Sequence, residues 1–244
     1  MITKEELKKI RDIENSNLYY VEKEYLQYIF LQRISQDEDF TFKGGTCLKI
    51  AYDLERASED LDYSTNLELN ETKNRIRKYI KQYELLGMKY SITEKIFENN
   101  YRIEIKIQGP LFSGDARTTN TIKIDCNKKT VYEKETKVID KKYSDVPVFI
   151  IKVLSRKEII AEKVRALVMR KQPRDLYDLY VQLMLKHEID WNLVKKKLNE
   201  ENIKKININF PTKKEYEEDL KKLTKVLPDY KEVIAKIKKV MPKK

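Results

Sequence analysis

The chain has 244 residues, of which 41% are hydrophobic, so it can bury one large core or two smaller ones without disulfides or structural metals. It carries 51 Lys and Arg against 40 Asp and Glu, and its net charge of +11 favours a polyanionic partner. Apolar runs stay short of the ~20 residues that cross a bilayer, and the N-terminal sequence lacks a signal-peptide pattern. These features exclude a membrane protein and predict a cytoplasmic one.

Cysteine and histidine are too scarce for a zinc site or a disulfide framework. Cys47 and Cys126 have no metal-ligand spacing, so we expect both to be reduced core residues. The single histidine, His187, excludes a histidine-rich metal site and is expected to serve as a surface or helix-end group.

Residues 4–36 are expected to form two helices, the first capped by Thr3. Apolar and aromatic side chains recur at helical spacing from Tyr20 to Ile34. Tyrosines on this segment could stack on bases, but at helical spacing they are more often core residues.

A glycine turn precedes two aspartates in the stretch that follows. Gly44 and Gly45 separate an apolar run at 40–42 from a segment with helical periodicity, which predicts a strand, a tight turn and a helix. Asp60 and Asp62 come next, and on a strand their carboxylates would point to the same face. Paired carboxylates completed by substrate phosphates are typical of Mg²⁺ sites. The alternative is a solvated acidic turn, which the preceding glycine turn disfavours.

A basic helix and a set of strands are expected next. The helix covers 71–86, and its charged side could be an RNA-backbone patch or simply a solvated face; its cations are Lys73, Arg75, Arg77, Lys78 and Lys81. After Gly87 the apolar period changes from 3.6 to 2, which predicts a hairpin of strands 88–97 and 101–107 and a third strand at 119–126. On the third strand Asp125 lies opposite the apolar face, where a neighbouring strand could bring it beside Asp60 and Asp62.

The rest of the chain is predicted to be helical after one more strand. Residues 146–154 suit an edge strand or a connector, and Ser155 and Glu158 match a capping box. Helices are expected at 156–170, 173–186, 191–200, 212–226 and 229–240. The sequence therefore predicts an α+β protein, with a mixed sheet and its helices in residues 1–152 and a helical domain in residues 153–244.

Charged residues interrupt the apolar pattern of the second half. Lys163 lies within or beside the buried stripe of its helix, so it must reach solvent, pair with a carboxylate or bind an anion. Asp175 and Asp178 share one face of the next helix. A carboxylate in the first helical turn is also favoured by the helix dipole alone, so spacing leaves the role of Asp175 open.

Three sequence blocks together resemble the AbiEii/AbiGii-type toxin nucleotidyltransferases of abortive-infection and toxin–antitoxin systems, within the DNA polymerase β-like superfamily. They are KGGTCL at 43–48, RASEDLDY at 56–63, and EIIAEKVRA at 158–166 followed by Arg170 and PRDLYDL at 173–179. The resemblance implies a minimal nucleotidyltransferase fold followed by a helical domain, with the site in the cleft between them.

The same resemblance assigns roles to individual residues. It implies that Asp60 and Asp62 hold Mg²⁺, with Mn²⁺ as an alternative, and that Asp125 activates the attacking hydroxyl. It places Lys163 and Asp175 in the catalytic site. The residues implied for nucleotide binding are Lys43, Gly44, Gly45, Thr46, Ser58, Lys163 and Arg174.

The function expected from the resemblance is transfer of a nucleoside monophosphate from an NTP to RNA, most often the 3′ end of tRNA, by a toxin with a cognate antitoxin. A protein or small-molecule acceptor is the alternative within the same enzyme class. A non-catalytic binding protein with a vestigial site and a DNA-binding regulator are alternatives from other classes. The sequence does not determine the oligomeric state.

Overall fold

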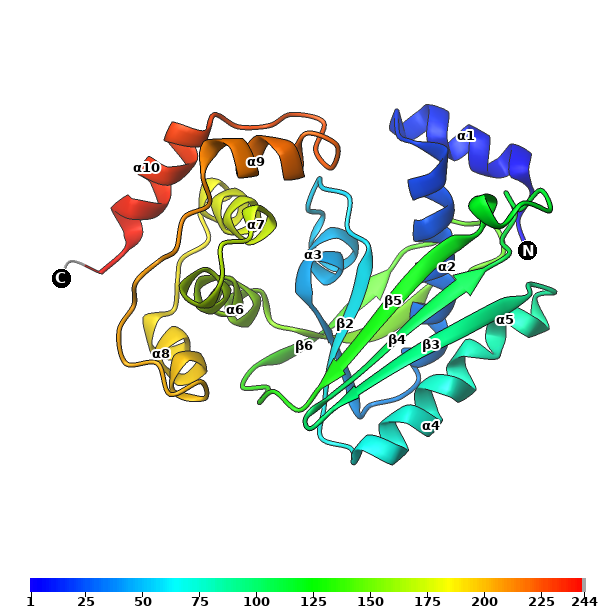
Figure 1. Cartoon of the computed structure of the whole chain (residues 1–244), viewed down its shortest axis with the longest axis horizontal. Helices are drawn as coiled ribbons and strands as arrows, with labels where there is room; N and C mark the ends of the chain where they lie inside the picture. The colour runs from blue at the N-terminus through cyan, green and yellow to red at the C-terminus, as the bar shows by residue number, and fades with distance from the viewer. Residues whose placement is uncertain (243–244) are drawn as a thin grey trace. The chain divides into compact units, whose positions relative to one another are not determined.

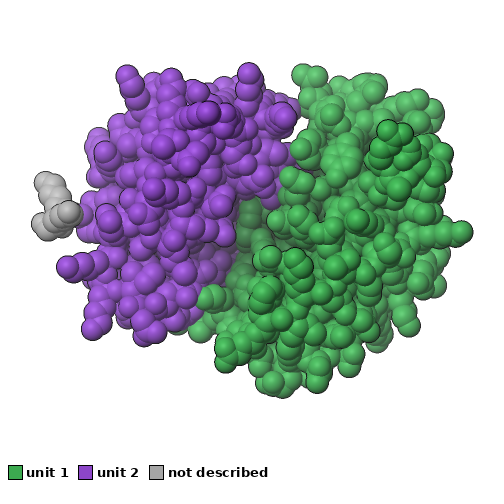
Figure 2. Space-filling view, viewed as in Figure 1, with its two compact units in different colours: residues 1–47, 59–153 green, residues 48–58, 154–244 purple. Residues whose placement is uncertain are grey.

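The computed structural model describes residues 1–242, and the chain divides into two compact units. Unit 1 contains residues 1–47 and 59–153, and unit 2 contains residues 48–58 and 154–244 (Figure 2). Unit 1 ends beside the boundary predicted near residue 152. The membership of residues 48–58 in unit 2 is not predicted by the sequence.

The N-terminal helices of unit 1 are α1 (Lys4–Glu14) and α2 (Leu18–Ile34), as predicted. Thr3 and Glu6 form a full capping box at the start of α1. Helix α2 packs against α1, α4, α5 and the sheet, so it is buried on most of its surface. Tyr25 and Tyr28 lie in the core, whereas Tyr19 is exposed.

A seven-stranded mixed sheet forms the centre of unit 1 (Figure 1). Its strand order is β3-β4-β5-β2-β1-β7-β6. The strands are β1 (Phe40–Lys43), β2 (Asp60–Thr65), β3 (Tyr90–Phe97), β4 (Asn100–Ile107), β5 (Asn120–Asn127), β6 (Lys134–Ile139) and β7 (Phe149–Leu154). Strand β2 runs antiparallel to β1 and parallel to β5, and the α+β class is confirmed.

Most predicted elements of unit 1 are present, with three differences. The single helix expected at 71–86 is two helices, α4 (Leu69–Ile80) and α5 (Gln82–Leu85), which meet at Lys81. Strand β6 is not predicted by the sequence. Strand β7 lies between β1 and β6, so it is an inner strand and not an edge strand. A short 3₁₀ helix, Ala116–Thr118, precedes β5.

Unit 2 is built from helices α6 (Arg156–Met169), α7 (Pro173–Met184), α8 (Trp191–Asn199), α9 (Lys213–Leu220) and α10 (Tyr230–Val240). Helix α3 (Gly44–Tyr52) begins in unit 1 and ends in unit 2. The Ser155 hydroxyl caps α6 by accepting a hydrogen bond from the Glu158 N–H, as expected. Helix α9 ends at Leu220, earlier than predicted. Within residues 1–242, no helix is both long and apolar enough to cross a membrane.

Candidate active site

The glycine turn and the aspartate strand are held together by local contacts in unit 1. Strand β1 ends at Lys43, and α3 begins directly at Gly44, whose φ of +80° lies in the left-handed region. A Cβ atom at Gly44 would overlap the Asp62 carboxylate. The Thr46 hydroxyl donates a hydrogen bond of 2.5 Å to the Asp60 carbonyl oxygen. The predicted turn is therefore packed against both aspartates.

Two residues predicted to bind phosphate have structural contacts of their own. Lys43 is buried, and its Nζ donates a hydrogen bond of 2.9 Å to Asn127 Oδ1 on β5. Thr46 is fully buried, and its hydroxyl contacts Asp60 as described above. These contacts join β1 to β5 and α3 to β2, whereas the roles of Lys43 and Thr46 in nucleotide binding stay predictions.

Gly44→Ala is expected to lower both stability and nucleotide transfer. The left-handed backbone costs an L residue about 1–2 kcal/mol, and the new methyl group must displace the Asp62 carboxylate. Gly87→Ala is the matched control, because Gly87 has a φ of +78° and no heavy atom within 4 Å of the added Cβ. Chemical denaturation and initial transfer rates separate the effects. Equal loss of transfer in both variants would contradict the contact between residue 44 and Asp62.

The sheet register brings Asp125 to Asp62, as the alternation of the third strand predicted. On the parallel strands β2 and β5, Asp62 pairs with Asp125 and Asp60 pairs with Lys123. Paired residues point to the same face, so the three aspartates share one face of the sheet. Asp60 is exposed, Asp62 is half-buried and Asp125 is buried.

Arg102 on β4 binds Asp125, a contact that the sequence does not predict. Its Nε and Nη2 donate hydrogen bonds of 2.8 Å and 2.5 Å to Asp125 Oδ2. The hydrogen bonds and charge of Asp125, followed by the charges of Asp60 and Asp62, raise the pKa of Arg102 despite partial burial. Both contacts use Oδ2, so Oδ1 has no hydrogen-bond partner within the described residues.

Asp60 and Asp62 of unit 1 suit a metal ion as a pair of ligands, without a third protein carboxylate. No group of three or more His, Cys, Asp or Glu residues in positions 1–242 is arranged to hold a metal ion. Asp60 and Asp62 supply hard oxygen ligands from one face of β2, and the Asp62 carboxylate lies directly against Gly44, where a side chain would displace it. One or two carboxylates plus substrate phosphates are the usual ligands of Mg²⁺, so this pair suits that ion.

In unit 2, Lys163 on α6 lies between two carboxylates of α7. Its Nζ is 2.8 Å from Asp175 Oδ1 and 2.7 Å from Asp178 Oδ2. Burial alone would lower the pKa of Lys163, but the two carboxylates raise it above its ordinary value. Lys163 is therefore a charged lysine. Arg170 also binds Asp175, with Nη2 at 2.9 Å from Oδ2.

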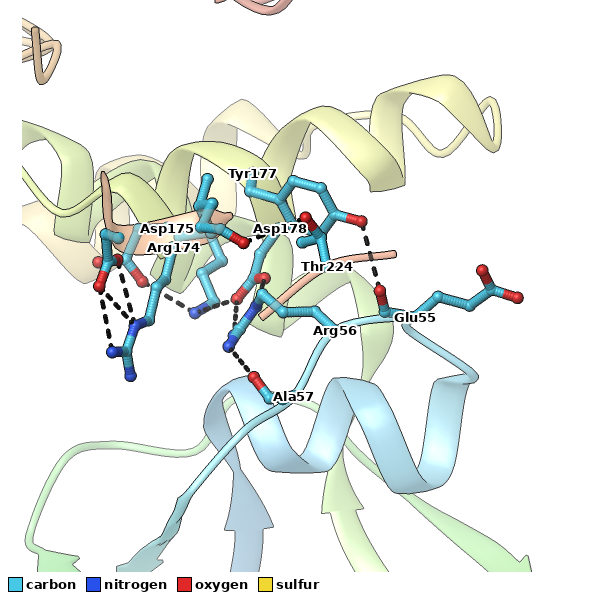
Figure 3. A network of polar contacts seen from close by, with 11 residues as sticks. Glu55, Arg56, Ala57, Arg174, Asp175, Tyr177, Asp178 and Thr224 are labelled. Atoms are coloured by element: carbon cyan, nitrogen blue, oxygen red, sulfur yellow. Dashed lines mark hydrogen bonds and ion pairs between the residues drawn. The ribbon is translucent and has the colours of Figure 1, made fainter. Parts of the chain in front are cut away.

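Arg56 completes this buried network from the segment that follows α3. Its Nε and Nη2 donate hydrogen bonds of 2.8 Å and 2.9 Å to the two oxygens of Asp178 (Figure 3). Burial would raise the pKa of Asp178, but Arg56 and Lys163 hold it below its ordinary value. Both side chains are almost fully buried. The sequence blocks contain Arg56 and Asp178, but their pairing is not predicted.

The segment around Arg56 has further contacts within unit 2. Arg56 Nη1 donates a hydrogen bond of 2.8 Å to the carbonyl oxygen of Ala57. The Ala57 N–H in turn donates a hydrogen bond of 2.8 Å to the Leu223 carbonyl oxygen. The side chain of Arg56 and the backbone of Ala57 thus connect residues 48–58 to the helices of unit 2.

Two other predicted nucleotide-binding residues, Arg174 and Ser58, are next in the chain to Asp175 and Ala57 of this network. Arg174 forms an ion pair with Asp219 of α9, at 3.2 Å. Ser58 is half-buried in the segment that precedes β2. Their assignment to nucleotide binding stays a prediction.

The basic helix, for which an RNA patch and a solvated face were the two alternatives, has much of its charge neutralised. Three of the five cations of this helix form ion pairs with carboxylates of the protein. Lys73 and Arg77 pair with Glu94. Arg75 pairs with Asp37, Asp39 and Glu71. Lys78 and Lys81 are exposed. These ion pairs favour the solvated-face interpretation of this helix.

The minor predictions are also met. Cys47 and Cys126 are buried thiols that are not joined in a disulfide, and burial raises the pKa of the Cys126 thiol well above its ordinary value. His187 follows the end of α7, and its Nε2 lies 2.8 Å from an Arg156 nitrogen. Burial and the charge of Arg156 lower the pKa of His187, so it is neutral near pH 7.

Comparisons with known proteins agree with this fold. A family model described as nucleotidyl transferase AbiEii toxin, type IV toxin–antitoxin system, matches residues 28–242. The structure is similar to MenT4, a nucleotidyltransferase toxin from Mycobacterium tuberculosis H37Rv, with a TM-score of 0.71 and 16% identity over 98% of this chain and 88% of that chain. It is also similar to JHP933 from Helicobacter pylori, with a TM-score of 0.55 and 21% identity over 76% of this chain and 75% of that chain.

A search of curated proteins found no significant match. The two structural neighbours share too little sequence to show more than the fold, but the family match covers most of the chain. The resemblance seen in the three sequence blocks is thereby confirmed. The chain belongs to the AbiEii family, the nucleotidyl transferase toxins of type IV toxin–antitoxin systems.

Proposed function

We propose that this protein transfers a nucleoside monophosphate from an NTP to the 3′-hydroxyl of an RNA and releases pyrophosphate. The observation that carries the proposal is the pair Asp60 and Asp62 on one face of β2, directly against the glycine turn at Gly44. The net charge of +11 favours a nucleic-acid acceptor. The 3′ end of tRNA, in the cytoplasm, is the first acceptor to test, and a cognate antitoxin is the expected partner.

In the proposed reaction the RNA 3′-oxygen forms a bond to the α-phosphorus, and the bond from that phosphorus to the bridging oxygen breaks. The pyrophosphate leaves with the bonding electrons, and Asp125 Oδ1 accepts the proton of the hydroxyl. Asp60 and Asp62 would hold Mg²⁺, which when bound supplies positive charge against the negative charge that grows on the pyrophosphate. The backbone at Gly44 and Gly45 receives the phosphates in this scheme.

From unit 2 we assign Lys163 to the triphosphate, with Asp175 and Asp178 as the carboxylates that position it. Two of the three donors of its ammonium group are directed at these carboxylates. Because all three groups are buried, the lysine is held in one place before substrate arrives.

The direct test is incubation of the purified protein with total RNA and each labelled NTP, with Mg²⁺ or with EDTA. We expect label at RNA 3′ ends, dependent on Mg²⁺ and absent with Asp60→Ala. Sequencing of the labelled 3′ ends identifies the acceptor. If the label appears on a protein or a small molecule, that molecule and not RNA is the acceptor. If no molecule is labelled, the result supports a binding protein with a vestigial site.

Lys163→Ala is expected to raise the KM for NTP or lower kcat at least tenfold while leaving the KM for RNA unchanged. The variant also removes a cation from the buried carboxylates of Asp175 and Asp178, so the protein should unfold at a lower denaturant concentration. Lys197→Ala is the matched control, because Lys197 is fully buried in unit 2 and binds Glu158 at 2.5 Å. We expect the control to lower the stability of the protein in an unfolding experiment. Its KM for NTP, measured by steady-state kinetics, should not change. An unchanged KM and kcat with Lys163→Ala would exclude the triphosphate contact.

A further inference from the structure

One face of strands β3, β4 and β5 is polar and exposed, and it is the face that carries Asp60, Asp62 and Asp125. On β4 the side chains alternate, with Ile103, Ile105 and Ile107 fully buried and Arg102 and Lys106 exposed. Helices α2 and α4 pack against β5 and β4, and the buried side chains occupy that covered face. The alternation therefore leaves the opposite face of these strands open.

Four exposed cations lie on this open face. The register pairs Lys95 with Arg102 and Arg102 with Asp125, and it pairs Lys106 with Thr121. Lys123 has the same orientation as Asp125, two residues away on β5. All four cations are exposed: Lys95, Arg102, Lys106 and Lys123.

These cations differ from those of α4 in how they are compensated. On α4, Lys73, Arg75 and Arg77 form ion pairs with carboxylates of the protein. Within residues 1–242, Arg102 binds Asp125 and the three lysines of the open face form no ion pair. The three lysines of the open face, which also carries Glu104 opposite Lys123, are therefore more available to an external anion than the paired cations of α4.

The open face leads directly to the aspartate pair. One row of the register runs from Lys95 through Arg102 and Asp125 to Asp62, across four neighbouring strands. Strands lie about 4.8 Å apart, so this row covers about 14 Å. A nucleic-acid strand in a helix has a phosphate about every 3.4 Å along its axis, so the row has room for several phosphates next to the acceptor's reactive end.

We propose that the open face of β3–β5 binds the backbone phosphates of the RNA acceptor through Lys95, Arg102, Lys106 and Lys123. The occupant is RNA, because the proposed acceptor is an RNA and the face carries exposed cations beside the proposed catalytic carboxylates. Phe97 on β3 supports this choice: it is 51% exposed and, at two residues from Lys95, has the same strand orientation, so a base can stack on it. The inference rests on the proposed function for the identity of the acceptor.

Equilibrium binding of a fluorescent tRNA, followed by anisotropy over a series of salt concentrations, tests this surface without any transfer reaction. We expect Lys95→Gln/Lys123→Gln to weaken binding on the order of 30-fold at about 0.1 M salt if each lysine contacts one phosphate. The slope of log K against log salt should become shallower by about 1.4 to 1.8. Phe97→Leu should weaken binding without changing the slope.

The rival surface provides the matched control. Lys78→Gln/Lys81→Gln removes the same charge from two exposed lysines at the end of α4. Because α4 packs on the covered face of the sheet, opposite the aspartates, we expect less than a twofold effect. A larger loss in this control than in Lys95→Gln/Lys123→Gln, or no loss in either, would overturn the proposal. A wild-type protein that binds RNA through the open face but labels no RNA would leave this proposal standing and refute the proposed transfer.

Discussion

Asp60→Ala is expected to reduce nucleotide transfer by about three orders of magnitude or more while leaving stability unchanged. The size follows from the loss of a ligand for the ion that neutralises the developing charge, since electrostatic stabilisation is commonly the largest contribution to catalysis. Stability should be preserved because the Asp60 side chain is exposed. Its backbone carbonyl, which accepts the hydrogen bond from Thr46, remains in the variant.

Three measurements make this prediction specific. Initial rates of label transfer give the activity, thermal unfolding gives the stability, and Mn²⁺ binding followed by electron paramagnetic resonance gives the metal affinity without turnover. Asp140→Asn is the control, because Asp140 is exposed and lies outside the candidate site. Wild-type turnover or wild-type Mn²⁺ affinity in Asp60→Ala would remove Asp60 from the metal site.

Arg56→Met is expected to destabilise the protein by about 3–5 kcal/mol. The reason is that the variant leaves the buried carboxylate of Asp178 with Lys163 as its remaining cation, and breaking a buried ion pair from one side is strongly unfavourable. Loss of this contact should also release residues 48–58 from the helices of unit 2. Denaturant unfolding with separate probes for the two units would measure the change and show whether unit 2 unfolds first.

Two further variants separate the charge effect from simple loss of packing. Arg117→Met removes an arginine whose side chain is 90% exposed, so no measurable change is expected. Arg56→Met/Asp178→Leu removes both partners and leaves Lys163 paired with Asp175, so it should recover part of the lost stability, because an apolar pair can replace a buried ion pair. If Arg56→Met unfolds at the same denaturant concentration as the wild type, the buried pair does not stabilise unit 2.

Local features of the chain were predictable because short-range physics determines them. Thr3 caps α1 and Ser155 caps α6 wherever the rest of the chain lies, since a cap needs only the next turn of helix. The glycine turn before α3 and the alternation of β4 are local for the same reason. The orientation of Asp60 and Asp62 toward one face also followed from the two-residue period of a strand.

Long-range contacts were not predictable in the same way. Strand β6 has few buried side chains, so it carries a weak sequence signal, and β7 became an inner strand because β6 pairs beyond it. The ion pairs of α4 join residues far apart in sequence, such as Arg75 and Asp37. The sequence left two interpretations of the basic helix open, an RNA patch and a solvated face, and these contacts favour the second.

The sequence by itself determined the α+β class, the glycine turn, the paired aspartates and the charged positions of α6 and α7, because each depends on neighbours within a few residues. Only the tertiary structure decided which charges meet: Arg102 with Asp125, and Arg56 with Asp178. Strand register and the packing of residues 48–58 against the helices of unit 2 fix these pairs, and both are set by contacts between distant parts of the chain.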